Sequence, residues 1–432
     1  MSLSGWGQFP KVNTKALTFN GEKALKKLMH DEPNLIAFGN GRSYGDSALS
    51  DQVLKMTSYQ HFLSFDEAKG VLSIESGVLL SDILTAMVPR GWFLQVTPGT
   101  KLITVGGAIA SDVHGKNHHQ AGCFSESVIE FDLMLPNGQI KSCSKTENSD
   151  LFHATCGGMG LTGIILQVKI QLKAVSSKNI LQTTIKTQNL KQTFDAFEKY
   201  KNEPYSVAWI DCLATDDALG RCLLMVGDFA EDGDLNYQPK RKFKIPFFLP
   251  NFALNNLTVK LFNFLYFNKV NREVSQQQVD IDTFFYPLDA LQDWYKIYGK
   301  NGFVQYQFIL PKETSSDGLE AILKRIANSG KGSFLAVLKL YGAANDNYLS
   351  FPMEGYSLAL DFKVEPGLFE LLDELDELVL QYRGRIYLAK DARVKQRVFE
   401  QGYEKVTDFR RLRKKYKLMG TFNSMQSKRV GI

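Results

Sequence analysis

The sequence has few of the features that would place a protein in an oxidising compartment or within a membrane. Its 432 residues include 5 cysteines, an odd number with no CxxC pair, which indicates free thiols in a reducing compartment and argues against a disulfide scaffold or a zinc site. No run approaches the ~18 apolar residues of a membrane-spanning helix. The opening residues lack a basic stretch followed by an apolar core, so we expect no secretory signal. These absences predict a cytoplasmic or peripherally membrane-associated protein.

Internal repeats and low-complexity segments are also absent, and 44% hydrophobic with 22% charged residues is ordinary globular usage. The length suggests about two or three domains. The net charge of +5 is unevenly spread, because residues 383–432 hold 15 Lys/Arg against 4 Asp/Glu, and residues 237–272 hold 7 Lys/Arg and no carboxylate. The remainder is acidic, so we expect two contacts with an anionic ligand or surface and no nucleic-acid partner.

Two different patterns of predicted elements along the chain indicate an α+β fold. Up to about residue 175, short apolar runs alternate with short helical patterns, and Asn137-Gly138 predicts a hairpin turn. Few long crossover helices are present, which argues against a doubly wound parallel sheet. Beyond residue 175, aromatic-rich strands and helices predict an antiparallel sheet covered on one face by helices, followed by a short strand and a basic helical tail. The expected strands are 71–75, 93–96, 128–135, 163–172, 205–212, 221–226, 304–310, 333–340, 356–362 and 385–388, and the expected helices are 80–88, 150–156, 190–200, 316–329 and 367–382.

Three glycine-rich loops occur in the first half, at residues 39–46, 97–107 and 156–163. Glycine permits positive φ and close backbone approach, so successive N–H groups can converge on an anion such as a pyrophosphate. Each loop alone is also explained as a tight turn between strands. Three such loops so close together favour the anion-binding interpretation.

Gly158, Gly160 and Gly163 formally match G-x-G-x-x-G. The dinucleotide fingerprint requires a strand before these glycines and a helix after them. Here a helical pattern precedes them and a β-rich run follows, so we reject a Rossmann site.

The segment from Ser111 to His119 concentrates titratable side chains directly after the second glycine loop. His114 and His118 have the i, i+4 spacing that can bind zinc on a helix, but no carboxylate follows in the H-E-x-x-H manner, and we expect no metal site. The histidines either pack as ordinary buried residues or line a ligand site, and both interpretations stay open at this point.

Several longer motifs carry a family resemblance. They are 41–46 (GRSYGD), 105–110 (VGGAIA), 114–119 (HGKNHH), 160–165 (GLTGII), 304–308 (VQYQF), 334–342 and 387–391 (YLAKD). In these motifs the chain resembles FAD-linked oxidoreductases of the vanillyl-alcohol-oxidase/PCMH type. Within that group it is most similar to the decaprenylphosphoryl-β-D-ribose 2′-oxidase family, flavin subunits of the epimerase that makes the arabinose donor of bacterial cell walls.

The resemblance implies a PCMH-type FAD-binding domain at 1–175, a substrate-binding domain at 176–384 and a C-terminal segment, 385–432, that returns to the FAD domain. It also implies non-covalent FAD, because Arg42 stands where some relatives tether the flavin through a histidine. The cofactor-binding residues that it implies are Gly39, Asn40, Gly41, Arg42, Ser43, Tyr44, Gly45, Pro98, Gly99, Thr100, Gly106, Gly107, Ala110, Ser111, His114, Asn117, Gly157, Gly160, Leu161, Gly163, Ile164 and Tyr387.

For chemistry, the resemblance implies oxidation of a secondary hydroxyl, the 2′-OH of a polyprenyl-phosphate pentose, to the keto sugar. This would be the first half of an epimerisation in cell-envelope glycan synthesis, completed by a short-chain dehydrogenase partner. Alcohol oxidation needs a base for the hydroxyl proton and a hydride path to the flavin. The implied catalytic residues are Lys390, His114 and Tyr387, and the implied substrate residues are Lys116, Gln305, Gln307, Lys339, Ser357, Ala359 and Lys390.

Some alternatives stay open. Lys390 acts as a base, acts by its charge alone, or is a solvated lysine at a strand end. Where the most similar relatives have Gly-Trp-Asn-Ile-Cys-Val-Asp-Phe, this chain has Ser357 and Ala359 at the Asn and Cys positions, so the sugar is not fixed. A soluble sugar, alditol or lactone oxidase and a flavin-free lipid-phosphate-binding protein are the competing functions.

The segment 237–272 combines nine aromatic residues with its cations. Asn, Lys and Pro interrupt it too often for a membrane span. It is either an insert packed on the substrate domain or a lid that meets an anionic membrane surface.

Overall fold

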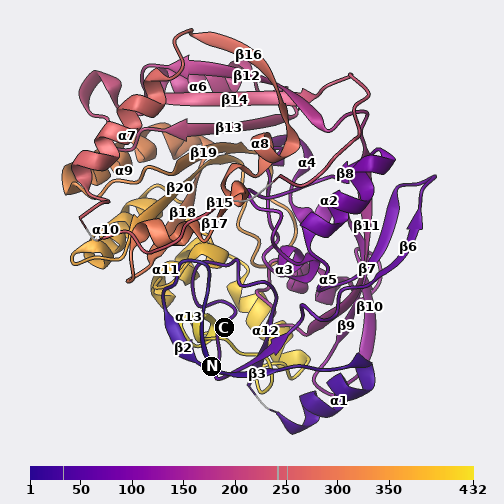
Figure 1. The fold of residues 1–432 in the computed structure, drawn as a ribbon. Helices are drawn as coiled ribbons and strands as arrows, with labels where there is room; N and C mark the ends of the chain where they lie inside the picture. The colour runs from indigo at the N-terminus through magenta and orange to yellow at the C-terminus, as the bar shows by residue number, and fades with distance from the viewer. Residues whose placement is uncertain (33, 241–242, 251) are drawn as a thin grey trace.

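Three of the five sheets in the described residues organise the chain, and the two larger ones lie at the upper left and at the right of the view (Figure 1). The computed structural model describes residues 1–432 with the exception of 33, 241–242 and 251. Both termini lie close together at the bottom of the view, beside the helices that end the chain.

A small parallel sheet supports the first glycine loop. Its order is β3–β5–β4 (Lys15–Leu17, Gln52–Lys55, Leu35–Phe38). The amphipathic helix α1 (Gly21–Asp31) buries Leu25 and Met29 in the adjoining core. Because β4 ends at Phe38, the glycine loop begins at the carboxyl edge of this sheet. A two-stranded sheet of β1 (Ser2–Ser4) and β2 (Lys11–Asn13) precedes it.

The second sheet is antiparallel and completes the first half. Its order is β10–β9–β11–β7–β6, and β8 also pairs with β11. The predicted hairpin at Asn137-Gly138 is confirmed, since Met134 of β9 pairs with Ile140 of β10. The strands are β6 (Phe62–Asp66), β7 (Val71–Glu75), β8 (Trp92–Leu94), β9 (Val128–Met134), β10 (Ile140–Ser144) and β11 (Ile164–Ala174), and the helices are α2 (Leu80–Met87), α3 (Val105–Ala110), α4 (His118–Ala121) and α5 (Ser149–Thr155).

The third sheet has eight strands in the order β16–β12–β14–β13–β19–β20–β18–β21, every neighbouring pair antiparallel. Helices α6, α9 and α10 cover one face of it, as the sequence predicted. Its strands are β12 (Asn179–Thr187), β13 (Tyr205–Ile210), β14 (Cys222–Phe229), β16 (Val274–Asp280), β18 (Phe303–Pro311), β19 (Ala336–Tyr341), β20 (Gly355–Lys363) and β21 (Arg385–Ile386). The remaining elements here are α6 (Leu190–Lys199), β15 (Phe243–Lys244), α7 (Asn256–Asn268), α8 (Ile281–Phe285), β17 (Leu291–Gln292), α9 (Ser315–Ser329) and α10 (Leu368–Gln381).

Side-chain alternation divides the residues of each strand between the helix-covered face of this sheet and the opposite face. On β18, Tyr306 points to the helices, where its hydroxyl donates to Asp376 of α10 (3.0 Å). Gln305 and Gln307, one residue to either side, therefore point to the opposite face. That opposite face is free of α9 and α10 and forms one wall of the functional cavity.

The C-terminal segment contacts both halves. The predicted strand 385–388 is shorter than expected: β21 ends at Ile386, and residues 388–390 form a 3₁₀ turn because Lys390 N–H donates to Tyr387 O (3.0 Å). β21 pairs with β18, whereas Phe422 bridges to Leu35 beside the first sheet. The helices are α11 (Gln396–Gly402), α12 (Val406–Lys415) and α13 (Met425–Val430). We propose the boundaries 1–175, 176–384 and 385–432, with the last segment belonging to the FAD-binding half after its first strand.

Candidate active site

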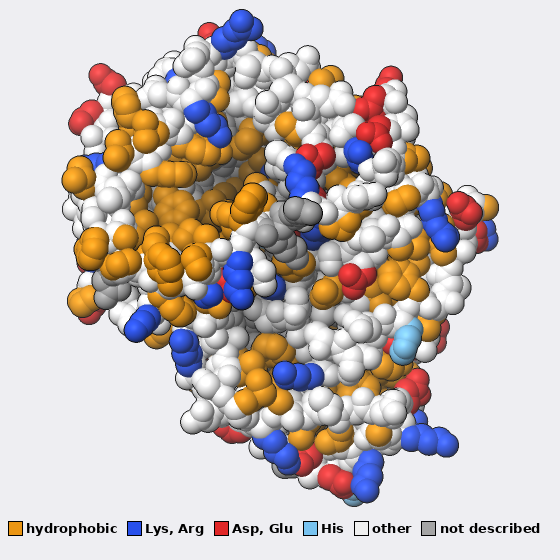
Figure 2. Space-filling model, in the orientation of Figure 1, with side chains coloured by type: hydrophobic (Ala, Val, Ile, Leu, Met, Phe, Trp, Pro, Cys, Tyr) orange, Lys and Arg blue, Asp and Glu red, His pale blue; other side chains and the backbone are white. Residues whose placement is uncertain are grey.

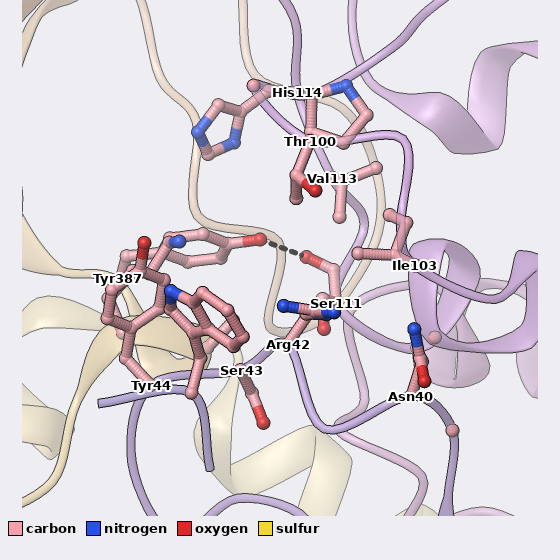
Figure 3. A pocket seen from close by; sticks show the side chains of 18 of the residues that line it. Asn40, Arg42, Ser43, Tyr44, Thr100, Ile103, Ser111, Val113, His114 and Tyr387 are labelled. Atoms are coloured by element: carbon pink, nitrogen blue, oxygen red, sulfur yellow. Dashed lines mark hydrogen bonds between the residues drawn. The ribbon is translucent and has the colours of Figure 1, made fainter. Parts of the chain in front are cut away.

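A cavity of about 340 Å³ lies between the two halves. The glycine loops form one side of it, and the face of β18, β19 and β20 that is turned away from the helices forms the other. Figure 3 shows part of the lining, with Asn40 and Tyr387 on opposite sides of the view.

The first glycine loop is fixed by backbone contacts and carries a cation. Trp6 N–H donates to Ser43 O (2.7 Å), and the Asn40 amide donates to Leu102 O (2.8 Å). The Arg42 guanidinium stacks 4.0 Å from the centre of the Trp6 ring. Its buried Nε has no hydrogen-bond partner among the described residues, and burial lowers the pKa of Arg42. A buried guanidinium N–H without an acceptor at a cavity wall is suited to an anionic ligand.

The second glycine loop packs tightly against the first. Thr104 caps α3 by accepting a hydrogen bond from Gly107 N–H (3.1 Å). A Cβ atom at Gly39 would stand 2.5 Å from Thr104 Oγ1, so this approach requires glycine. A Cβ at Gly99 would meet no described atom within 4 Å, which leaves its backbone open to the cavity. The two loops thus present backbone to a ligand at close range.

The third glycine loop joins α5 to β11. Helix α5 precedes the glycines and a strand follows them, which confirms the rejection of a Rossmann arrangement. Met159 N–H donates to Ala110 O (2.8 Å), so this loop is bonded to the end of α3. Gly160 and Gly163 line the cavity.

His114 and Tyr387 both line the cavity and lie near each other (Figure 3). The Tyr387 hydroxyl donates to Ser111 O (2.9 Å), and its ring lies 5.0 Å from that of His114. Gln307 Nε2 donates to His114 Nε2 (3.1 Å), which places the imidazole proton on Nδ1. That Nδ1 is buried and has no partner in the described part of the chain. Burial and the neighbouring Lys339 hold the pKa of His114 well below its usual value, so the ring is neutral and offers one N–H.

Three lysines converge on the cavity. Lys390 Nζ stands 3.8 Å from the centre of the Tyr44 ring, and burial lowers the pKa of Lys390 to about 7. Burial lowers the pKa of Lys116 to about 7 and that of Lys339 to about 8. Within the described residues, none of the three forms an ion pair with a carboxylate. Three such cations in one enclosed site call for an anionic ligand.

Two carboxylates were not anticipated, Asp289 on the cavity wall and Asp361 behind it. Asp289 accepts from Thr100 Oγ1 (2.7 Å) and from Lys101 N–H (2.8 Å), and so ties the substrate half to the second glycine loop. Asp361 accepts from Gln305 Nε2 (2.5 Å). No local motif surrounds Asp289, but Asp361 lies in the same 355–362 motif as Ser357 and Ala359 and could have been selected with them.

The structure places most predicted site residues on the cavity wall. Those lining it are Gly39, Asn40, Gly41, Arg42, Ser43, Tyr44, Pro98, Gly99, Thr100, Gly106, Gly107, Ala110, Ser111, His114, Lys116, Gly160, Gly163, Gln305, Gln307, Lys339, Ser357, Ala359, Tyr387 and Lys390.

Five predicted cofactor residues lie behind the wall instead. A Cβ at Gly45 would meet Asp391 O at 1.8 Å, and the Asn117 amide donates to Gln95 O (2.8 Å). Gly157 N–H donates to Ile109 O (2.9 Å), while Leu161 and Ile164 are core residues. These five residues support the loops through packing and backbone hydrogen bonds. Their position in a motif does not by itself distinguish such a supporting residue from one that lines the cavity.

The remaining histidines of the segment have other partners. Gly342 N–H donates to His118 Nδ1 (3.1 Å), and burial lowers the pKa of His118 to about 3. His119 Nε2 donates to Glu203 O (2.8 Å). Nowhere in the described part of the chain do three His, Cys, Asp or Glu side chains gather as a metal site would require. His114 therefore fits the site-lining interpretation, and His118 that of an ordinary buried histidine.

The lining fits a flavin dinucleotide. Close-packed glycine backbone and the unpaired Arg42 Nε suit a pyrophosphate, and the buried Nδ1–H of His114 offers a further donor. FAD, when bound, supplies the acceptor for a hydride from a substrate carbon.

Comparisons with known proteins agree with this fit. A family model described as FAD binding domain matches residues 22–144. Decaprenylphosphoryl-β-D-ribose oxidase of Mycolicibacterium smegmatis is 33% identical over 99% of this chain and 97% of its own length. L-Gulonolactone oxidase of Mus musculus is 30% identical over 40% of this chain and 39% of its own. The putative D-arabinono-1,4-lactone oxidase of Neurospora crassa is 26% identical over 43% of this chain and 33% of its own.

Fold, cavity and similarity together define the class: this is an FAD-dependent oxidoreductase acting on CH–OH groups, built on a PCMH-type FAD-binding domain. The lactone oxidases share less than half of the chain, whereas the mycobacterial oxidase matches almost all of it. The chain therefore belongs to the decaprenylphosphoryl-β-D-ribose oxidase family.

Proposed function

We propose that this enzyme oxidises the 2′-hydroxyl of a polyprenyl-phosphate pentose to the keto sugar. The observation that carries the proposal is the pair Lys116 and Lys339 on the substrate side of the cavity. Lys116 Nζ contacts the Phe284 ring (4.8 Å to its centre), and each ammonium repels the other. A phosphate between them would relieve both the repulsion and the loss of hydration.

The proposed chemistry assigns a proton path and a pocket for the sugar. Lys390 takes the hydroxyl proton, or stabilises the alkoxide by its charge, while His114 and Tyr387 orient the sugar. Gln305, Gln307 and Ser357 offer hydrogen bonds to the remaining hydroxyls, and Ala359 shapes the pocket. The keto sugar is then reduced by a separate enzyme, for which a short-chain dehydrogenase fits, to complete an epimerisation in cell-envelope glycan synthesis.

The second candidate is a soluble sugar, alditol or lactone oxidase, favoured by the partial similarity to lactone oxidases. Such substrates carry no phosphate and would leave Lys116 and Lys339 without a counter-charge. Anaerobic reduction of the bound flavin by a panel of substrates separates the two. We expect reduction by lipid-phosphate pentoses and slow or no reduction by free pentoses, alditols and lactones. Equally fast reduction by the free compounds would reject the proposal.

Matched variants test the lysine pair directly. Lys116→Met and Lys339→Met should each raise the half-saturating concentration of the lipid-phosphate substrate by about 10-fold or more, since a charge-assisted hydrogen bond contributes about 1.5–3 kcal/mol. Lys363→Met, on the same sheet but outside the cavity lining, is the control. A purified protein without flavin would instead favour the flavin-free binding function.

We also propose that α7 brings the enzyme to an anionic membrane surface. Val207 lines the cavity, and Trp209, two residues further along β13 and on the same face, packs on Tyr266 of α7 (4.8 Å between ring centres). Apolar side chains thus continue from the cavity to α7, where Figure 2 shows them gathered around a hollow. None of the helices that the structure describes is long and apolar enough to cross a bilayer.

A further inference from the structure

Asp361 is a buried carboxylate that the proposed reaction does not use. It lies on β20, on the same face as Ser357 and Ala359, with 1% of its surface exposed. A carboxylate in such a place costs free energy unless hydrogen bonds or a cation stabilise it. In the part of the chain that the structure describes, no Lys or Arg is in ion-pair contact with it, and burial raises the pKa of Asp361.

Side chains from two neighbouring segments hold its oxygens. Gln305, directly opposite in the β18–β20 register, donates to Oδ1 (2.5 Å), and the Tyr298 hydroxyl donates to Oδ2 (3.4 Å). Tyr298 stacks on Phe303 (4.2 Å between ring centres), and Phe303 makes an edge contact with Tyr44 (5.4 Å). Aromatic rings therefore separate the carboxylate from solvent.

Lys390 lies beside the same group of aromatic rings. Lys390 Nζ lies over the Tyr44 ring, and the groups that act on its charge are Asp361 from β20 and Lys339 from β19. His114, held neutral, is a further titratable neighbour, and Lys390 disfavours its protonation. Asp361 raises the pKa of Lys390, against burial and Lys339, which both lower it.

We propose that Asp361 is a positioning residue for Lys390: its carboxylate, fixed by Gln305 and Tyr298 behind the aromatic rings that Lys390 borders, acts by its charge on the Lys390 amine. The inference rests on the proposed function, in which Lys390 meets the hydroxyl proton of the substrate. It also explains the orientation of Gln305. Because Asp361 takes up the Gln305 amide nitrogen, the Oε1 atom remains as an acceptor for a ligand hydroxyl.

The test measures Lys390 itself and needs no substrate. The FAD-loaded protein is labelled at a series of pH values with 1-fluoro-2,4-dinitrobenzene, which reacts with neutral amines, and Lys390 modification is followed by peptide mass spectrometry. Asp361→Asn removes the charge at constant size. It should lower the pH at which Lys390 modification is half-maximal, its midpoint, by about one unit, which is the lower end of the effect expected from a nearby opposite charge. Tyr298→Phe, which keeps the carboxylate but removes a donor, should move it the same way by less. Asp361→Glu should stay near wild type.

Asp376→Asn is the matched control. Asp376 is also 1% exposed, but it lies on α10 behind the opposite face of the sheet and binds the Tyr306 hydroxyl. Its loss should leave the Lys390 midpoint unchanged. An unmoved midpoint in both Asp361→Asn and Tyr298→Phe, or equal shifts in Asp361→Asn and Asp361→Glu, would overturn the inference. If the midpoint shifts while no lipid-phosphate sugar reduces the flavin, the proposed function fails and the inference about Lys390 stands.

Discussion

At the scale of single residues, Lys390 combines burial, a cavity position and a pKa lowered to about 7 from its usual 10.5. Burial disfavours the ammonium, so the fraction of neutral amine grows as pH rises through this value. We expect the rate of anaerobic flavin reduction to rise with pH over the same range. Lys390→Met should retain FAD, slow reduction by about 10²-fold and remove this rise.

The control for Lys390 is Lys395→Met. Lys395 is exposed and pairs with Asp373 at the surface (2.7 Å), so its loss should leave the pH profile as in wild type. Stopped-flow absorbance of the flavin measures the reduction rate of both variants as a function of pH. A rate that falls with rising pH would show that Lys390 acts as a charged ammonium, and an unchanged rate in Lys390→Met would make it peripheral.

Arg42 gives a prediction about how FAD is held. An arginine cannot form the covalent tether, so acid precipitation should release all flavin into the supernatant, as absorbance of the two fractions would show. Arg42→Met should weaken FAD binding by about 10-fold or more, because the variant loses charge-assisted hydrogen bonds worth about 1.5–3 kcal/mol. Flavin remaining on the denatured polypeptide, or unchanged affinity in the variant, would contradict this assignment.

At the scale of elements, α7 has two largely apolar faces. One holds it to the protein through Val259, Asn263 and Phe267, with the Asn263 amide donating to Asp211 (2.7 Å). The other faces solvent, and its Leu257, Leu261 and Leu265 are 57–75% exposed. An isolated leucine on a surface is common, but a whole helix face of this kind marks an interaction site.

We therefore expect wild-type protein to co-sediment with anionic vesicles at low salt and less at high salt. Replacing Leu257, Leu261 and Leu265 with Ser should release it, since burying each leucine contributes about 1.5–3 kcal/mol. Leu181→Ser, at an exposed apolar site on β12, is the control. Wild type that stays in the supernatant, or equal sedimentation of the triple variant, would assign α7 no membrane role.

The cations of the basic segment 237–272, which includes α7, contribute unequally. Lys240 pairs with Asp280 (2.5 Å) and donates to Thr283 (2.7 Å), so part of its charge is already neutralised. Lys244, Lys260 and Lys269 form no ion pair with the carboxylates of the described chain and remain for lipid headgroups. Arg241 and Lys242, which belong to the same basic segment of the sequence, lie outside the described residues.

At the scale of the whole molecule, an ion-pair cluster fastens the C-terminal segment to the FAD-binding half beside the cavity. Arg429 of α13 pairs with Asp46 of the first glycine loop (2.7 Å) and with Asp391, next to Lys390 (2.8 Å). Asp46 and Asp391 are buried. Removing the arginine leaves two buried carboxylates facing each other.

Arg429→Met should lower the free energy of unfolding by about 3–5 kcal/mol, the usual cost of breaking a buried ion pair on one side. Thermal melting and FAD retention would both report the change. Lys428→Met is the control, because its contact with Asp51 is long (3.7 Å) and exposed and should contribute at most about 1 kcal/mol. Equal melting temperatures for the two variants would show that Arg429 does not fasten the C-terminal segment to the FAD-binding half.

The sequence by itself predicted what depends on neighbours along the chain. The apolar stripe of α10 from Leu368 to Val379, the Asn137-Gly138 hairpin and the order of helix and strand around Gly158–Gly163 follow from local periodicity and turn chemistry. The FAD-binding motifs are equally local, because a loop that approaches a ligand closely needs glycine at fixed positions. Strands β12 and β16, at one edge of the large sheet, were not predicted, since their polar residues weaken the alternating pattern.

Only the tertiary structure decided what depends on contacts between distant segments. It separated Gly39, which lines the cavity, from Gly45, which packs against Asp391, although both lie in one motif. It brought Asp361 and Gln305 together across two strands, and it left one face of α7 exposed. A sequence pattern shows how apolar and polar side chains alternate along the chain. Burial and charge pairing are set by residues far away in the chain, and these determine the proton affinity of Lys390 and the exposure of the apolar face of α7.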